Sequence, residues 1–350
     1  MMMRFRYALF LWLLLSAAAD GQSNRATASV CRDCHWQATS QPSTTMGHAL
    51  ETVKDSEVLA THQRLTTVQA GYTYRIVRDG DQSIYSVSNG AETISMPILW
   101  AVGASFSIGQ TYILEKDGQW YESRVSWFRE LQGLGPTLGN QNYVPVNLAD
   151  AAGRPISPDE KLLCMGCHST DAVSGRKLTL QSLVPGVQCA HCHANLDAHV
   201  SAEEGLPLPA GESHGQSFQL KNTSAQEVAD FCGNCHRTWA EIAAQGKPGI
   251  GNIRFQPYRL TESKCFDPYD KRISCLACHD PHKEVDSVAA DYTAKCLACH
   301  GGAKPGARSC RVSQSNCVSC HMPKLELPGA HYRFTDHRIR VVKPGEPYPG

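Results

Sequence analysis

The sequence lacks a surplus of charge of either sign and, after its first residues, lacks long apolar runs. Lys plus Arg and Asp plus Glu each number 33 among 350 residues, so the formal net charge is zero. This balance gives no reason to expect nucleic acid as a partner. Hydrophobic residues make up 42% and charged residues 19%, a composition that excludes a disordered chain. No stretch after residue 19 is long and apolar enough to span a bilayer.

Residues 1–19 are predicted to be a signal peptide. Arg4 and Arg6 precede the apolar run 8–15, and small residues follow at 16–19. The apolar stretch is shorter than the ~20 residues that a membrane-spanning helix needs. An uncleaved membrane anchor is the alternative. We therefore expect an exported protein, periplasmic or extracellular, that does not span the membrane after cleavage.

Cysteine and histidine are the abundant unusual residues, with 16 and 15 copies. Fourteen cysteines form seven Cys-x-x-Cys-His units, at residues 31–35, 164–168, 189–193, 232–236, 275–279, 296–300 and 317–321. Covalent c-type haem attachment needs this pattern, because two thiols add to the vinyl groups and the adjacent histidine binds the iron. Structural zinc, a disulfide framework and thioredoxin-like chemistry give no reason for the histidine. The sequence thus predicts seven covalently bound haem c cofactors with their iron.

The residues predicted to hold these haems follow from the units. The covalent attachment sites are Cys31, Cys34, Cys164, Cys167, Cys189, Cys192, Cys232, Cys235, Cys275, Cys278, Cys296, Cys299, Cys317 and Cys320. The proximal iron ligands are His35, His168, His193, His236, His279, His300 and His321. No catalytic residue is predicted.

Eight further histidines are available as distal ligands. His191 lies between two haem-binding cysteines and is not expected to be a ligand. The candidates are His48, His199, His282, His337, His331, His214 and His62. We expect bis-histidine ligation at most or all irons, with methionine ligands as the alternative.

His282 is predicted to serve a unit other than its own. It lies three residues after His279. Two trans nitrogens stand ~4 Å apart through the metal, with the porphyrin between them. Three residues extend at most ~11 Å, too short a path around the ring edge and back. The same argument applies with less force to His199, six residues after His193.

The fold expected from these patterns is a multihaem cytochrome c, mainly short α-helices and loops wrapped around haems. An N-terminal antiparallel β-hairpin segment is predicted at residues ~70–128, with turns at 78–81 and 116–118. The clearest helical stretches are 227–236 and 239–245. The expected organisation is a signal peptide at 1–19, a first haem site plus β segment at 20–160, a six-haem region at 161–340 and a Pro/Gly-rich tail at 341–350.

The first unit and the residues after it carry a family resemblance. Cys31 to His35 followed by Thr45-Met46-Gly47-His48 resembles the cytochrome c-554-type (cytochrome c-552/4 domain) family. Segments 122–127, 254–260, 275–282, 321–324 and 335–338 are similar to a branch of exported multihaem proteins. The resemblance implies that His48 is a distal ligand.

Three functions are compatible with these features. The first is electron transfer through a chain of mostly bis-histidine haems, with redox proteins of unknown identity as partners. The second is a multihaem reductase or oxidoreductase of a small nitrogen or sulfur compound at one open iron. Related enzymes often carry Cys-x-x-Cys-Lys at the active haem, and that motif does not occur here. The third is a polymerising cytochrome filament. We favour the electron carrier.

Cys265 and Cys310 stand outside the seven units. Because an exported compartment is oxidising, we expect them to form a disulfide that closes a loop around two units. Two free thiols are the alternative.

Overall fold

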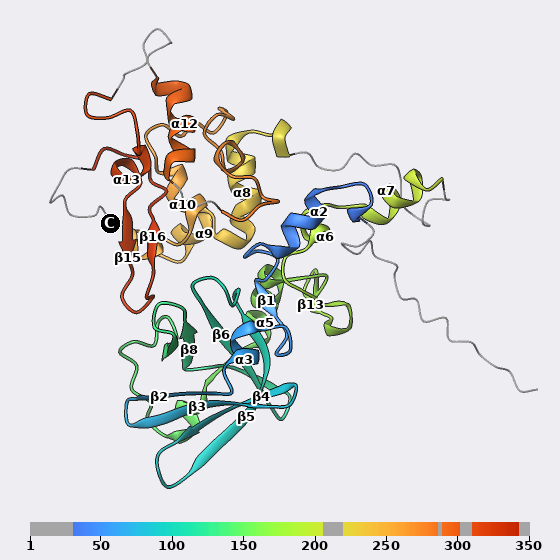
Figure 1. Ribbon diagram of the computed structural model, residues 1–350, viewed down its shortest axis with the longest axis vertical. Coiled ribbons are helices and arrows are strands. Elements are labelled where there is room, and N and C mark those ends of the chain that lie inside the picture. The colour runs from blue at the N-terminus through green and yellow to red at the C-terminus, as the bar shows by residue number, and fades with distance from the viewer. Residues whose placement is uncertain (1–30, 206–219, 286–288, 302–309, 343–350) are drawn as a thin grey trace, which may run out of the picture.

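The computed structural model describes residues 31–205, 220–285, 289–301 and 310–342 (Figure 1). The predicted signal peptide, His214 and the chain from residue 343 onward lie outside these residues. Within them, no helix is long and apolar enough to cross a membrane.

An antiparallel β-sheet is the largest element of the fold. In the described part of the chain it contains ten strands, in the order β10-β7-β6-β5-β4-β3-β2, with β1 added to β5 and with β8 and β9 extending from β6. The strands are β1 (Leu50–Glu51), β2 (Arg64–Gln69), β3 (Tyr72–Asp79), β4 (Gln82–Ser88), β5 (Thr93–Val102), β6 (Gly109–Lys116), β7 (Gln119–Glu122), β8 (Val125–Phe128), β9 (Gly133–Pro136) and β10 (Arg154–Pro155).

Alternating side chains explain why these residues form strands. Tyr74 and Ile76 on β3 and Tyr85 and Val87 on β4 are buried in one core cluster, while their neighbours point away from it. The β3–β4 turn contains Gly80 at φ 58°, a conformation that glycine adopts without steric cost. The hairpins predicted at turns 78–81 and 116–118 are therefore present as β3–β4 and β6–β7.

The predicted fold class is nevertheless wrong. The chain is not mainly short helices wrapped around haems, because the curled sheet runs from β1 to β10 and far exceeds a hairpin segment at 70–128. The alternation of apolar and polar residues in the sequence indicated only part of this sheet. Strand β5 carries an apolar run with Pro97, which hides its period, and β1 and β10 have only two residues each.

Helices carry most of the Cys-x-x-Cys-His units. They are α5 (Pro158–His168), α6 (Cys189–Cys192), α8 (Ala225–His236), α11 (Cys275–Cys278), α12 (Ala289–His300) and α13 (Cys317–His321). Capping boxes begin α5 at Ser157 and α8 at Ser224. The predicted helix at 227–236 lies within α8, and the one at 239–245 matches α9 (Trp239–Ala244).

The remaining elements are short. The helices are α2 (Gln37–Ser40), α3 (Glu57–Thr61), α4 (Leu148–Ala152), α7 (Leu196–Glu203) and α10 (Gln256–Thr261). Three small antiparallel pairs join β11 (Ser169–Thr170) with β14 (Val184–Pro185), β12 (Val173–Ser174) with β13 (Lys177–Leu178), and β15 (Lys324–Glu326) with β16 (Arg333–Thr335).

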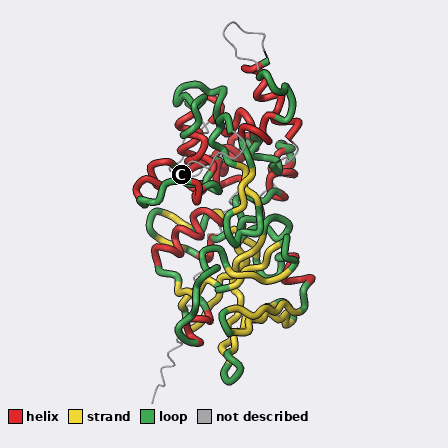
Figure 2. Tube along the Cα trace, turned by 90° about the vertical axis from the view of Figure 1, so that its left-hand side faces the viewer, coloured by secondary structure: helices red, strands yellow, loops and turns green. Residues whose placement is uncertain are grey.

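Most strands lie at one end of the molecule and most helices at the other, although α3, α4 and α5 pack with the strands (Figure 2). The segment that contains the first unit precedes β1, lies outside the sheet and packs beside α6, although about 150 residues separate the two in sequence (Figure 1). Gln41 Nε2 donates to the Val187 carbonyl at 2.6 Å, and Gln188 Nε2 donates to the Gly47 carbonyl at 3.1 Å. This packing brings the first and third units together.

Candidate functional site

Three pairs of histidines face each other in the described residues. We call them pair A (His35 and His199), pair B (His193 and His282) and pair C (His279 and His337). Their ring centroids lie 6.1, 6.0 and 6.3 Å apart, and their interplanar angles are 42°, 16° and 42°. Each pair joins the histidine of one Cys-x-x-Cys-His unit to a histidine outside the units.

The spacing of these pairs fits one metal ion between two imidazoles. Two metal–nitrogen bonds of ~2 Å separate the nitrogens by ~4 Å, and the distance from each nitrogen to its ring centre adds ~1 Å, giving about 6 Å between ring centres. All three centroid distances agree with this value. Each pair therefore offers two imidazoles, and the two cysteines of its unit, as the residues that would hold a c-type haem.

Two short chain segments connect the three pairs. Residues 193–199 run from pair B to pair A, and residues 279–282 run from pair C to pair B. Six residues extend at most ~21 Å and three at most ~11 Å, so neighbouring pairs must lie close together. The pairs form a series in the order A, B, C.

Within pair B, the structure places His282 opposite His193 rather than opposite His279. Asp280 positions it, because its Oδ1 accepts from the His282 backbone N–H at 3.0 Å and lies 3.1 Å from His282 Nδ1. A hydrogen bond at Nδ1 leaves Nε2 as the nitrogen that can bind a metal. Burial, followed by the neighbouring His282, lowers the pKa of His193.

Pair C has neutral groups at both Nδ1 atoms. The Tyr292 hydroxyl lies 3.3 Å from His279 Nδ1, and the Thr335 carbonyl lies 3.0 Å from His337 Nδ1. Burial lowers the pKa of His337 to about 4, so the ring is neutral at physiological pH. Both rings of pair C can thus present Nε2 towards the space between them.

A buried ion-pair network holds the segment that carries His337. Arg259 on α10 donates through Nε and Nη2 to the Asp336 carboxylate at 2.9 and 3.1 Å, and both side chains are fully buried. Arg340 donates to the same carboxylate at 2.6 Å, and Glu262 accepts from Arg259 at 3.0 Å. Asp336 directly precedes His337, so this network positions one ring of pair C.

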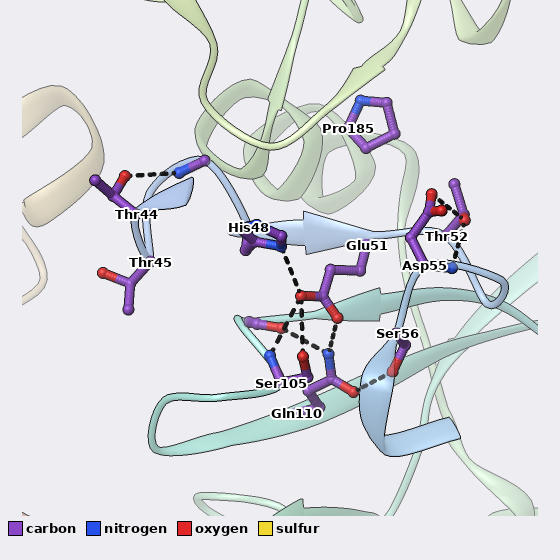
Figure 3. A network of polar contacts seen from close by, with 12 residues as sticks. Thr44, Thr45, His48, Glu51, Thr52, Asp55, Ser56, Ser105, Gln110 and Pro185 are labelled. Atoms are coloured by element: carbon purple, nitrogen blue, oxygen red, sulfur yellow. Dashed lines mark hydrogen bonds and ion pairs between the residues drawn. The ribbon is translucent and has the colours of Figure 1, made fainter. Parts of the chain in front are cut away.

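His48 belongs to a different polar network, shown in Figure 3. Its Nδ1 lies 3.0 Å from Oε1 of Glu51, whose carboxylate is buried on β1. Gln110 donates to the other carboxylate oxygen at 2.6 Å, and Ser105 donates to Oε1 through its backbone N–H and its hydroxyl at 3.3 Å. Phe106 packs edge-on against the His48 ring. Glu51 therefore fixes the orientation and the tautomer of His48.

The other sequence candidates lie in separate surroundings. His168 Nδ1 faces the Ala49 carbonyl at 2.9 Å, and His321 Nδ1 faces the Arg340 carbonyl at 2.9 Å. Burial lowers the pKa of both His168 and His236. His62 faces the Val58 carbonyl and packs near Trp127 in the sheet, and His331 packs against Phe128. His191 Nε2 lies 4.0 Å from the sulfur of Cys235.

The cysteines of different units meet in pairs. Side-chain hydrogen bonds join Cys31 with Cys189, Cys167 with Cys235, Cys232 with Cys275, and Cys296 with Cys317. The Cys235 thiol donates to Cys167, which lowers the pKa of Cys167 to about 7 and raises that of Cys235. Units distant in sequence thus lie beside one another.

The predicted Cys265–Cys310 disulfide is wrong. Both cysteines are free and exposed. Sequence placed them on either side of two units but gave no information on the distance between them.

The expectation of seven covalently bound haem c cofactors must also be corrected. Throughout the described ranges, no group of three or more His, Cys, Asp or Glu side chains could hold a metal ion. The sheet-dominated fold likewise differs from a chain wrapped around seven haems. The histidine ring contacts of the described residues join three unit histidines to a histidine outside the units, at pairs A, B and C, so the repeat of the motif overstated what the fold assembles.

Several residues of these sites were missed by sequence reasoning. They are Glu51, Asp280, Tyr292, Arg259 and Asp336. The spacing His48–Glu51 and the sequence His279-Asp280-Pro281-His282 could have indicated the two carboxylates. Arg259 and Asp336 are 77 residues apart, and nothing in the sequence connects them.

Comparison with known proteins identifies no relative. No family model, no curated protein and no solved structure matches the chain. The resemblance to cytochrome c-554-type proteins is therefore wrong, since no family match supports it and the fold is mostly antiparallel sheet. A few short motifs shared with a family did not imply its fold.

Proposed function

We propose that this chain transfers electrons through c-type haem held at pairs A, B and C. The attachment cysteines are those of units 31–35, 189–193 and 275–279. The observation that carries the proposal is the series of three imidazole pairs at 6.0–6.3 Å, connected by segments 193–199 and 279–282. When bound, haem supplies the one-electron oxidation and reduction of its iron.

The residues of the chain bind and orient the group in this proposal. The two cysteines of each unit would provide covalent attachment, and the paired histidines would hold the iron. Because each pair offers two imidazoles to one iron, a substrate would find no open position there. This arrangement favours electron transfer over reduction of a small nitrogen or sulfur compound.

The short segments set the distances between sites. His279 and His282 belong to different pairs but lie three residues apart, so pairs B and C are held together by the backbone itself. His193 and His199 do the same for pairs A and B. Such spacing suits successive electron transfer, with redox proteins as the external donor and acceptor.

An exported location accompanies this function. The basic start and apolar run of residues 1–19 support export to the periplasm or the cell exterior. Redox partners in the same compartment would exchange electrons with the ends of the series.

Removal of one ring from pair B tests the proposal. In the exported, haem-loaded protein, His282→Ala should convert one low-spin ferric site to high-spin, as read by absorption and electron paramagnetic resonance. His62→Ala serves as the matched control, because His62 faces Val58 and Trp127 rather than another imidazole. The control should leave the spectrum unchanged.

The affected site can be assigned with a second background. When Cys189 and Cys192 are both replaced by Ala, His282→Ala should add no further high-spin signal. If the signal instead depends on Cys275 and Cys278, the assignment of His282 to pair B is wrong. If the unaltered protein shows no low-spin haem signal, the proposed function is wrong.

A further inference from the structure

We propose that Asp280 makes pair B the site of lower reduction potential than pair C, so that electrons pass from B to C. The inference rests on the proposed function, since it concerns haem bound at these pairs. It gives the series a direction. The carrying observation is the different chemistry at the Nδ1 atoms of the two neighbouring pairs.

The carboxylate of Asp280 is a direct partner of pair B. Its Oδ1 lies 3.1 Å from His282 Nδ1 and also accepts the His282 backbone N–H at 3.0 Å. The two hydrogen bonds fix both the position of the ring and its contact with a negative charge. The Lys283 ammonium lies 3.7 Å from Oδ2 and is 59% exposed. Asp280 is itself 40% exposed, so solvent weakens this ion pair, and the direct hydrogen bond at Nδ1 is the contact that distinguishes pair B.

In the described residues, the Nδ1 partners at pair C differ from those at pair B. The Nδ1 partners of its rings are the Tyr292 hydroxyl and the Thr335 carbonyl, both of which are neutral. The nearby Asp336 carboxylate is compensated by two guanidinium groups, Arg259 at 2.9 Å and Arg340 at 2.6 Å. Asp336 still acts on His337 through its charge, but it makes no hydrogen bond to Nδ1 of either ring of pair C in the described residues.

A carboxylate at Nδ1 changes the imidazole as a ligand. It raises the basicity of the ring and places negative charge near the metal. Both effects stabilise the oxidised state, which carries one more positive charge than the reduced state, and so lower the potential. A carbonyl or hydroxyl partner has a smaller effect. Pair B should thus release an electron more readily than pair C.

The connection between the pairs makes this difference useful. His279 belongs to pair C and His282 to pair B, and Asp280 lies between them in sequence. One electron leaves the site at pair B, which is oxidised, and enters the site at pair C, which is reduced. His282 retains its Nδ1 proton in the hydrogen bond to Asp280, so the transfer needs no proton movement there.

Redox titration of the loaded protein tests the inference. The site at pair B is identified by the spectral component lost when Cys189 and Cys192 are replaced by Ala, and the site at pair C by that lost with Cys275 and Cys278. Pair B should have the lower midpoint. Asp280→Asn should raise the midpoint of pair B and leave that of pair C in place.

Two further variants separate charge from position. Asp280→Glu keeps the carboxylate, so its pair B midpoint should stay closer to the unaltered protein than that of Asp280→Asn. Asp159→Asn is the matched control. Asp159 lies on the first turn of α5, is exposed and forms an ion pair with Arg176. It should shift neither midpoint.

The outcomes distinguish the inference from the proposed function. A pair B midpoint equal to or above that of pair C overturns the inference, as does Asp280→Asn with unchanged potential and low-spin spectrum. An equal rise in the Asp280→Glu and Asp280→Asn variants also overturns it. The absence of low-spin sites at both pairs instead refutes the proposed function itself.

Discussion

Replacement of Asp336 by Asn should strongly destabilise the part of the fold that holds pair C. Asp336 is fully buried and accepts hydrogen bonds from Arg259, Arg340 and the Arg338 backbone N–H. Burial opposes the charged form of Asp336, but the hydrogen bonds from Arg259 and its neighbours prevail and lower the pKa of the carboxyl. Without the charge, a fully buried guanidinium loses its main counter-ion.

The magnitude follows from the remaining contacts. Removal of one partner of a buried ion pair costs about 3–5 kcal/mol. Arg259 keeps its 3.0 Å contact with Glu262, which is 22% exposed, and Asn can still accept one hydrogen bond. We therefore expect a loss near the lower end, roughly 2–4 kcal/mol in the free energy of unfolding.

Urea unfolding of the loaded protein measures this loss, with far-ultraviolet circular dichroism for the fold and the haem spectrum for pair C. The double variant Arg259→Met/Asp336→Leu should lose less than the sum of the two single changes, because it leaves no unpaired buried charge. Asp159→Asn is the exposed control and should change stability by less than ~0.5 kcal/mol. A loss below about 1 kcal/mol for Asp336→Asn, or strict additivity in the double variant, would refute the reasoning.

The other predictions concern two carboxylates. A hydrogen bond from the Ser157 backbone, followed by Arg154, lowers the pKa of Glu160 from 4.5 to about 2. The stabilisation that ionised Glu160 gives to the fold is thus present above pH 4.5 and is lost as the pH falls towards 2. Because Glu160 is 38% exposed, we expect this contribution to the free energy of unfolding to be less than ~1 kcal/mol. Glu160→Gln should flatten thermal stability over this pH interval, and an unchanged pH profile would contradict the prediction. Glu51→Gln places an amide where Gln110 and Ser105 donate, so urea unfolding should show a loss of about 1–3 kcal/mol; a loss no larger than that of exposed Glu57→Gln would contradict it.

Local patterns in the sequence were sufficient to predict individual helices and hairpins. Asp-Gly turns between alternating residues located the hairpins β3–β4 and β6–β7, and the Ser224 capping box precedes the helix α8. The three-residue connection from His279 to His282 is too short for both histidines to bind the same iron, so His282 was expected to face another histidine. The structure places His193 opposite His282. These inferences depend on neighbours within a few residues.

Long-range packing could not be predicted in the same way. The placement of the first unit beside α6 depends on contacts such as Gln41 with Val187, 146 residues apart. The buried Arg259–Asp336 pair likewise joins α10 to the C-terminal segment. The repeated Cys-x-x-Cys-His units led to the prediction of a helical multihaem fold. The ten-stranded sheet of the described chain was not predicted in full, because several of its strands are too short or too apolar to show a clear alternation.

Peptide mapping by mass spectrometry, on protein expressed with its N-terminal export segment, shows whether haem is attached at the three pairs. Proteolysis should yield peptides that contain Cys31 and Cys34, Cys189 and Cys192, and Cys275 and Cys278. We expect each peptide to be heavier than its polypeptide by one haem, attached through two thioether bonds. Recovery of these three peptides with unmodified thiols, from protein grown under conditions that permit haem attachment, would contradict it.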